Sequence, residues 1–160
     1  MCIYLCRQTE KMELEKEIKQ KSFKSPYHKL VLNILFSASW LNTLQNKTFK
    51  PYGISPQQYN ILRILRGQQG KAVALSVLQE RMIDKMSNAS RLVDKLLLKK
   101  MVDRKQCPED RRQVEISITE KGLDVLKQLD DKVNSLENSM NNVTEKEAAE
   151  VNRILDKMRD

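Results

Sequence analysis

The stretch from residue 78 to residue 122, LQERMIDKMSNASRLVDKLLLKKMVDRKQCPEDRRQVEISITEKG, decides the fold because its hydrophobic period changes once. Up to residue 100 the apolar residues recur at helical spacing. After residue 100 the period changes to two: Val102 and Arg104 alternate with Asp103 and Lys105. Over residues 114–118 the apolar Val114, Ile116 and Ile118 alternate with Glu115 and Ser117. Two helices separated by a tight turn are therefore followed by two strands, joined by residues 106–113 with Pro108 in the bend. This order predicts a winged helix-turn-helix.

The second of these helices is expected from Ser87 to Lys100 and has two different faces. Its apolar face consists of Ala89, Leu92, Val93 and Leu96, and the period is expected to begin at Met86. Its polar face consists of Ser87, Asn88, Ser90, Arg91 and Lys95, with Asp94 among them. Asn can pair with adenine and Arg with guanine through two hydrogen bonds each, so this face can read bases in a major groove. The alternative is an ordinary solvent-exposed helix face without a binding role. The two strands that follow the helix favour the DNA-reading interpretation.

The loop between the two strands carries a cluster of charges. Arg111 and Arg112 lie in the predicted wing, together with Lys105, and an Arg projected from a stiff hairpin suits a narrow minor groove. Asp110 would be repelled by phosphate, so its expected role is to orient a neighbouring Arg through a charge-assisted hydrogen bond. The alternative is that these charges serve solubility alone.

Helix-start signals recur along the rest of the chain. Ser25 with Pro26 begins a long helix, and Ser55 with Gln58 begins another, which carries Tyr59, Ile61, Leu62 and Leu65 inward. A third helix is expected from Ser76, with Gln79 three residues later. Thr144 with Glu147 forms a capping box for a last helix. The fold class is therefore mainly α, with a two-stranded wing.

The long helix predicted over residues 25–49, about 25 residues, would extend roughly 37 Å at about 1.5 Å per residue. Neither it nor the leucine stripe after Gly122 can be covered by the reading head of residues 51–118, and a second subunit would cover both. We therefore expect one domain with four parts: an arm over 1–24, a dimerisation helix over 25–50, the DNA-binding region over 51–118 and dimerisation helices over 119–160. A two-fold dimer predicts a palindromic operator.

The net charge of +8 and the pI near 9.4 favour a polyanionic partner. The charge is uneven: residues 119–160 are net acidic, whereas residues 86–112 hold eight basic and four acidic residues. Double-stranded DNA is the expected partner of that basic region. A winged-helix module that binds another protein is the alternative function, but it would have no need of this arrangement.

The residues 78–122 quoted above resemble the core of the MarR (multiple antibiotic resistance regulator) family of transcription factors. The wing carries the resemblance most specifically, with Asp110 and Arg112 in the family's D-x-R pattern and Ile118 to Gly122 as its exit, and the recognition helix SNASRLVDKL comes second. The resemblance implies an obligate homodimer with interleaved terminal helices, repression as the usual mode, and a pocket for a possible small aromatic or phenolic effector.

The remaining reactive residues do not form a recognisable site. Cys2, Cys6 and Cys107 are too few and too scattered for a disulfide framework, and the single His28 cannot supply a metal site. Cys107, next to basic residues, is a candidate redox thiol, although an inert thiol is the default. Residues 25–50 lack the cysteine that peroxide-sensing members of the family carry there.

Catalytic motifs are absent from the sequence, so no enzyme and no cofactor is expected. The only apolar stretch near the N-terminus, residues 3–6, is too short for a signal peptide or a membrane span. We therefore expect a cytoplasmic protein without a membrane partner, and Met12 could be the true start.

Overall fold

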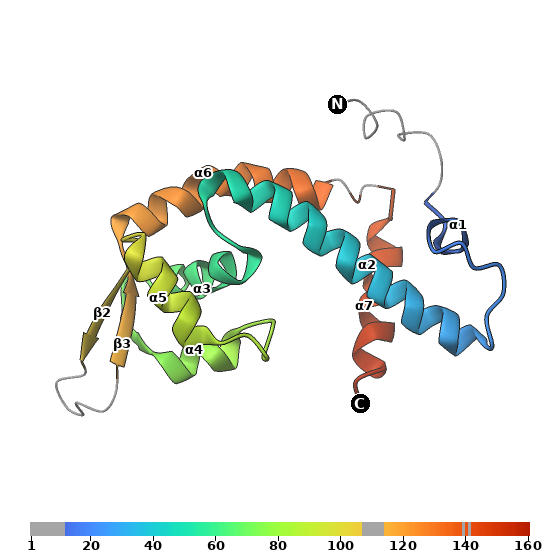
Figure 1. Cartoon of the computed structure of the whole chain (residues 1–160), viewed down its shortest axis with the longest axis horizontal. Coiled ribbons are helices and arrows are strands. Elements are labelled where there is room, and N and C mark those ends of the chain that lie inside the picture. The colour runs from blue at the N-terminus through green and yellow to red at the C-terminus, as the bar shows by residue number, and fades with distance from the viewer. Residues whose placement is uncertain (1–11, 107–113, 139, 141) are drawn as a thin grey trace. The chain divides into compact units, whose positions relative to one another are not determined.

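The computed structural model describes residues 12–106, 114–138, 140 and 142–160 (Figure 1). The chain divides into two compact units, one up to Leu44 and one from Gln45 onward, and each is described by itself. Within the described ranges the structure is mainly helical, with one small antiparallel sheet. The predicted mainly α winged helix-turn-helix fold is confirmed.

The first unit contains α1 (Leu14–Glu17) and most of α2 (Pro26–Phe49). Ser25 caps α2 as predicted, because its hydroxyl accepts a hydrogen bond from the backbone N–H of His28 at 3.1 Å. The ammonium of Lys29 on α2 pairs with the Glu15 carboxylate of α1. Only Phe49 of α2 is buried in this chain, so the apolar face of the helix is largely uncovered.

The second unit is built around α3 (Pro56–Arg66), which follows a short 3-10 turn at Lys50–Tyr52. The predicted capping box is present: the Ser55 hydroxyl accepts from Gln58 N, and the Gln58 side chain accepts from Ser55 N, each at 3.2 Å. Tyr59 is buried and stacks on Phe49, with ring centroids 4.4 Å apart. The bidentate pair of Arg66 with Asp130, at 2.9 and 3.0 Å, ties α3 to α6.

The sheet has three strands rather than the two that the sequence predicts. β1 (Val73–Ala74) pairs with β3 (Val114–Ile118), which also pairs with β2 (Val102–Gln106), all antiparallel. β1 is only two residues long, too short for an alternating pattern to reveal it. Its pairing fixes the chain just before α4 (Leu75–Arg81), which is followed by α5 (Ala89–Leu98).

Helix α6 (Glu120–Asn138) contributes to the same core as the reading helices. Leu126 and Leu129 are fully buried there, together with residues of α3, α4, α5 and the sheet: Leu62, Leu65, Leu78, Val93, Leu96 and Ile116. The expectation that a second subunit would cover the whole stripe after Gly122 is therefore wrong for its first half. Periodicity indicates that a face is buried, but not which chain buries it.

The last helix, α7 (Glu145–Lys157), starts at the predicted capping box, with Thr144 and Glu147 bonded in both directions. None of its residues is buried in this chain, and Val151, Ile154 and Met158 are exposed by 39 to 51%. Across the described residues, no helix combines the length and apolar character needed to cross a membrane.

Candidate nucleic-acid interface

Helix α5 begins at Ala89, two residues later than the sequence predicts. Asn88 is its N-cap, because its side-chain oxygen accepts a hydrogen bond from Arg91 N at 3.0 Å. Ser87 and Asn88 therefore lie in the preceding turn rather than on the helix face. Met86, expected to begin the apolar face, is 94% exposed. The helical spacing of Met86 is coincidental, since the strong capping preference of Asn starts the helix downstream of it.

The turn between α4 and α5 is organised by Asp84. One carboxylate oxygen accepts from Met86 N at 3.1 Å, and the other accepts from the Ser87 hydroxyl at 2.6 Å. The bond from Ser87 is the largest cause that lowers the pKa of Asp84 below its ordinary value. The carboxylate is thus kept ionised and engaged with the turn, although it lies at the surface that would meet DNA.

Gln79 of α4 closes the same turn from the other side. Its amide nitrogen donates to the carbonyls of Lys85 and Ser87, at 2.8 and 3.1 Å, and its oxygen accepts from Ala89 N at 3.2 Å. The prediction that Gln79 belongs to a start signal at Ser76 is wrong: α4 begins at Leu75, and its N-cap, Ala74, makes no side-chain bond. Gln79 instead fixes where α5 starts.

The predicted reading residues of α5 occupy the face opposite the core. Ala89, Val93 and Leu96 are buried, whereas Arg91 and Lys95 are exposed. In the turn, Asn88 is exposed and Ser87 is half-buried, and Ser90 in the first turn of α5 is also half-buried. The structure thus gathers these five side chains along one end and one face of α5.

A pair that the sequence did not reveal joins the wing to this helix. Arg104 on β2 donates to Asp94 on α5 at 3.0 Å. Asp94 thus lies on the polar face as predicted, but its negative charge is matched by the wing. Asp94 and Arg104 are ten residues apart, and the end of α5 and a turn lie between them. No periodic pattern in the sequence could therefore have indicated that they pair.

The wing strands are in register, with Val102 opposite Ile118 and Lys105 opposite Glu115. The hairpin tip lies outside the described residues. The predicted contacts Asp110, Arg111 and Arg112, and the candidate redox thiol Cys107, all fall in that range. Their roles remain predictions from the sequence.

Thr119 and Gly122 hold the junction between the wing and α6. The Thr119 hydroxyl donates to Lys100 O at 2.8 Å and accepts from Gly122 N at 3.2 Å, while Thr119 N donates to Met101 O at 3.2 Å. A Cβ on Gly122 would lie 2.3 Å from Met101 O. Only glycine therefore allows α6 to start so close to the end of the reading helix.

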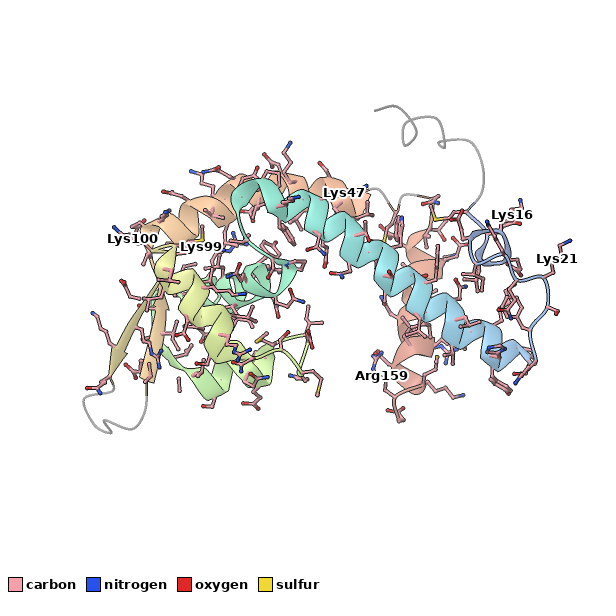
Figure 2. All side chains as sticks on the ribbon, in the orientation of Figure 1. Lys16, Lys21, Lys47, Lys99, Lys100 and Arg159 are labelled. Carbon is pink, nitrogen blue, oxygen red and sulfur yellow. The ribbon has the colours of Figure 1, made fainter. Side chains whose placement is uncertain are left out.

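Two lysines follow the C-terminal end of α5 (Figure 2). Lys99 donates to Gly53 O at 2.5 Å and to Gln58 Oε1 at 3.0 Å, which ties this end of α5 to the start of α3. Partial burial, helped by the charge of Lys95, lowers the pKa of Lys99 below its ordinary value. Its ammonium acts as an internal anchor of the reading head, whereas Lys100 is exposed.

Within the described ranges, no three side chains of the metal-ligating types come together in a way that could hold a metal ion. His28 accepts a hydrogen bond from Lys24 N at 3.4 Å and lies edge-on to Phe23. Its local contacts therefore account for it as a structural residue near the start of α2.

Known proteins resemble this chain both in sequence and in fold. The MarR family model matches residues 54–114, from just before α3 to the start of β3. The transcriptional repressor MprA of Escherichia coli K12 is 28% identical over 106 residues, which are 65% of this chain and 60% of that protein. The alignment thus spans less than two thirds of the curated relative.

Solved structures extend the likeness beyond the reading head. A MarR transcription factor from Planctomyces limnophilus is 27% identical and has a TM-score of 0.65, covering 86% of this chain and 98% of that one. A mutant MarR of Escherichia coli, solved in complex with operator DNA, has a TM-score of 0.73 at 22% identity. The match covers 86% of this chain and 99% of that one, and at this identity it supports a shared fold only. The family model thus matches the helix-turn-helix region, and the solved structures share the fold around it, so this chain is similar to MarR-family transcription factors.

Proposed function

We propose that this protein is a transcriptional regulator that binds a palindromic operator as a homodimer, and that it acts as a repressor. The observation that carries the proposal is the reading face of α5. Asn88, Ser90 and Arg91 lie at a helix start fixed by Asp84 and Gln79, and Lys95 lies further along the helix. A pre-organised polar face loses little conformational freedom on binding.

The dimensions of α5 suit the major groove. An α-helix with its side chains is about 10 to 12 Å across, and the major groove is about 12 Å wide. The N-terminal end of a recognition helix supplies most base contacts, which assigns base reading to Asn88, Ser90 and Arg91. We assign Ser87 and Lys95 to phosphate contacts. We assign Arg112 of the wing to the minor groove, with Asp110 and Arg111 beside it, on the sequence argument alone.

Uncovered apolar residues at both ends of the chain support the homodimer. On α2, Tyr27, Leu30, Val31 and Leu35 are exposed by 36 to 79%, and α7 exposes Val151, Ile154 and Met158. Contiguous exposed apolar residues of this kind mark interaction sites more often than scattered ones do. We assign dimerisation to residues 25–50 and to the part of 119–160 beyond Leu129, base reading to 51–118, and an accessory arm to 1–24.

The finer parts of the proposal rest on the relatives. The curated relative is named a transcriptional repressor, which favours repression here. We further infer release from DNA by a small aromatic or phenolic effector, a cytoplasmic location with the DNA, and no catalytic activity. Repression and release by an effector both require specific binding of the free protein to duplex DNA.

Selection from a random duplex pool by the full chain tests this requirement. We expect enrichment of two symmetric half-sites about one helical turn apart, near 34 to 36 Å. Affinity for the selected duplex should fall with salt, log K decreasing by about 0.9 per phosphate contacted against log salt.

Variants of exposed basic residues then separate the reading face from general charge. Arg91→Ala should weaken binding to the selected duplex much more than binding to random DNA. Lys127→Ala, on α6 outside the interface, should leave both affinities unchanged. A pool without an enriched motif, together with salt-insensitive binding, would contradict the proposal and favour a protein-interaction module instead.

A further inference from the structure

Met86 is the most exposed large apolar residue in the described part of the chain, at 94%. It lies in the turn before α5, two residues ahead of the N-cap Asn88. A single exposed apolar side chain is common on protein surfaces, but burial of its methyl and methylene groups against a ligand is favourable, and Met86 lies directly before the proposed reading helix. Neither packing within this chain nor capping of α5 explains its exposure.

Hydrogen bonds fix the backbone at Met86 and at the residues on either side of it. Met86 N donates to Asp84, and the carbonyls of its neighbours Lys85 and Ser87 both accept from the same Gln79 amide. Further upstream, Ile83 N donates to Asn60 on α3 at 3.0 Å. The side chain is therefore presented from a fixed position rather than from a loose loop.

The surroundings of Met86 fit DNA better than an apolar protein partner. Arg91 lies in the first turn of α5, and the carboxylate of Asp84 is engaged by the turn before the helix. The ammonium of Lys85 donates to the Glu80 carbonyl, so a second cation stays beside the turn. An exposed methionine just before the start of a reading helix lies close to the groove if that helix enters it.

The major groove offers one apolar group, the 5-methyl group of thymine. We propose that Met86 contacts a thymine methyl in each half-site and so selects thymine at that position. The inference rests on the proposed function, because it requires α5 to enter the groove. The flexible, polarisable thioether side chain of Met suits contact with a small methyl group.

Uracil substitution tests this contact directly, because it removes the methyl group and keeps the base pairing. In the duplex selected by the wild-type protein, each thymine is replaced singly by uracil and affinity is measured by fluorescence anisotropy. We expect one thymine per half-site at which uracil weakens binding about fourfold, the effect of losing one buried methyl group. Met86→Ala should bind the thymine and uracil duplexes equally, whereas Met86→Leu should keep the difference.

Leu98→Ala is the matched control, because Leu98 is a comparably exposed apolar residue at the other end of α5. It should retain the fourfold preference for thymine. If Met86→Ala also retains it, or if uracil is tolerated everywhere, the inference is overturned while specific DNA binding stands. If the wild-type protein selects no duplex, the proposed function fails and the inference fails with it.

Discussion

Replacing Gly122 by alanine should destabilise the protein strongly. The added Cβ would lie 2.3 Å from Met101 O and 2.7 Å from Ile118 Cγ1. The first of these distances is about 1 Å shorter than ordinary van der Waals contact, and its partner is backbone, which cannot rotate away. The start of α6 must therefore move away from the end of the reading helix.

Three contributions determine how much Gly122→Ala lowers the free energy of unfolding. Overpacking of this kind costs about 1 to 3 kcal/mol. The movement also strains the bond from Thr119 N to Met101 O, and a bond of this type contributes about 1 kcal/mol. Alanine regains up to about 1 kcal/mol over glycine within a helix. We expect the free energy of unfolding to fall by about 2 kcal/mol.

Urea unfolding followed by circular dichroism measures this change, at one fixed protein concentration because a dimer's stability depends on concentration. Gly67→Ala is the matched control. Gly67 already has right-handed helical backbone angles, and its added Cβ would come no closer than 3.4 Å to any atom beyond its neighbours. It should be neutral or more stable by up to about 1 kcal/mol. A Gly122→Ala protein as stable as the wild type would refute the reasoning about this junction.

Two further sets of variants, at the Asp94–Arg104 pair and at Gln79, test the contacts that hold α5. Asp94→Ala and Arg104→Ala should each change stability by less than about 1 kcal/mol, since the pair is partly exposed. A double-mutant cycle measured on DNA affinity should nevertheless show coupling, and strict additivity would argue against a wing anchored to α5. Gln79→Ala should weaken DNA binding more than Gln79→Glu, whose carboxylate can still accept from Ala89 N; equal losses would show that this bond does not fix the helix start.

Local signals in the sequence predicted the helices that start at strong caps. Ser55 with Gln58, and Thr144 with Glu147, form both bonds of the capping box, because each needs only residues three positions apart. The buried face of α5 was also predictable from its period. The period did not predict where α5 begins. Asn88 caps the helix, so α5 starts at Ala89 and not at the earlier residue that apolar spacing suggested.

Features that depend on distant residues could not be predicted. The role of Gln79 depends on the path of the turn after α4, and the pairing of Arg104 with Asp94 depends on how the wing lies against α5. The burial of Leu126 and Leu129 shows the same limit, because an apolar stripe does not say whether its partner lies in the same chain. Each of these outcomes was decided by tertiary packing.

Methylation interference on the selected duplex tests most directly whether α5 reads the major groove. Methylation of guanine N7 places a methyl group in that groove, at the edge where Arg pairs with guanine. We predict that N7 methylation blocks the wild-type protein at guanines in both half-sites, about one turn apart. Arg91→Ala should lose sensitivity at one of these guanines in each half-site. Interference confined to minor-groove positions, or an Arg91→Ala pattern identical to the wild type, would contradict the account.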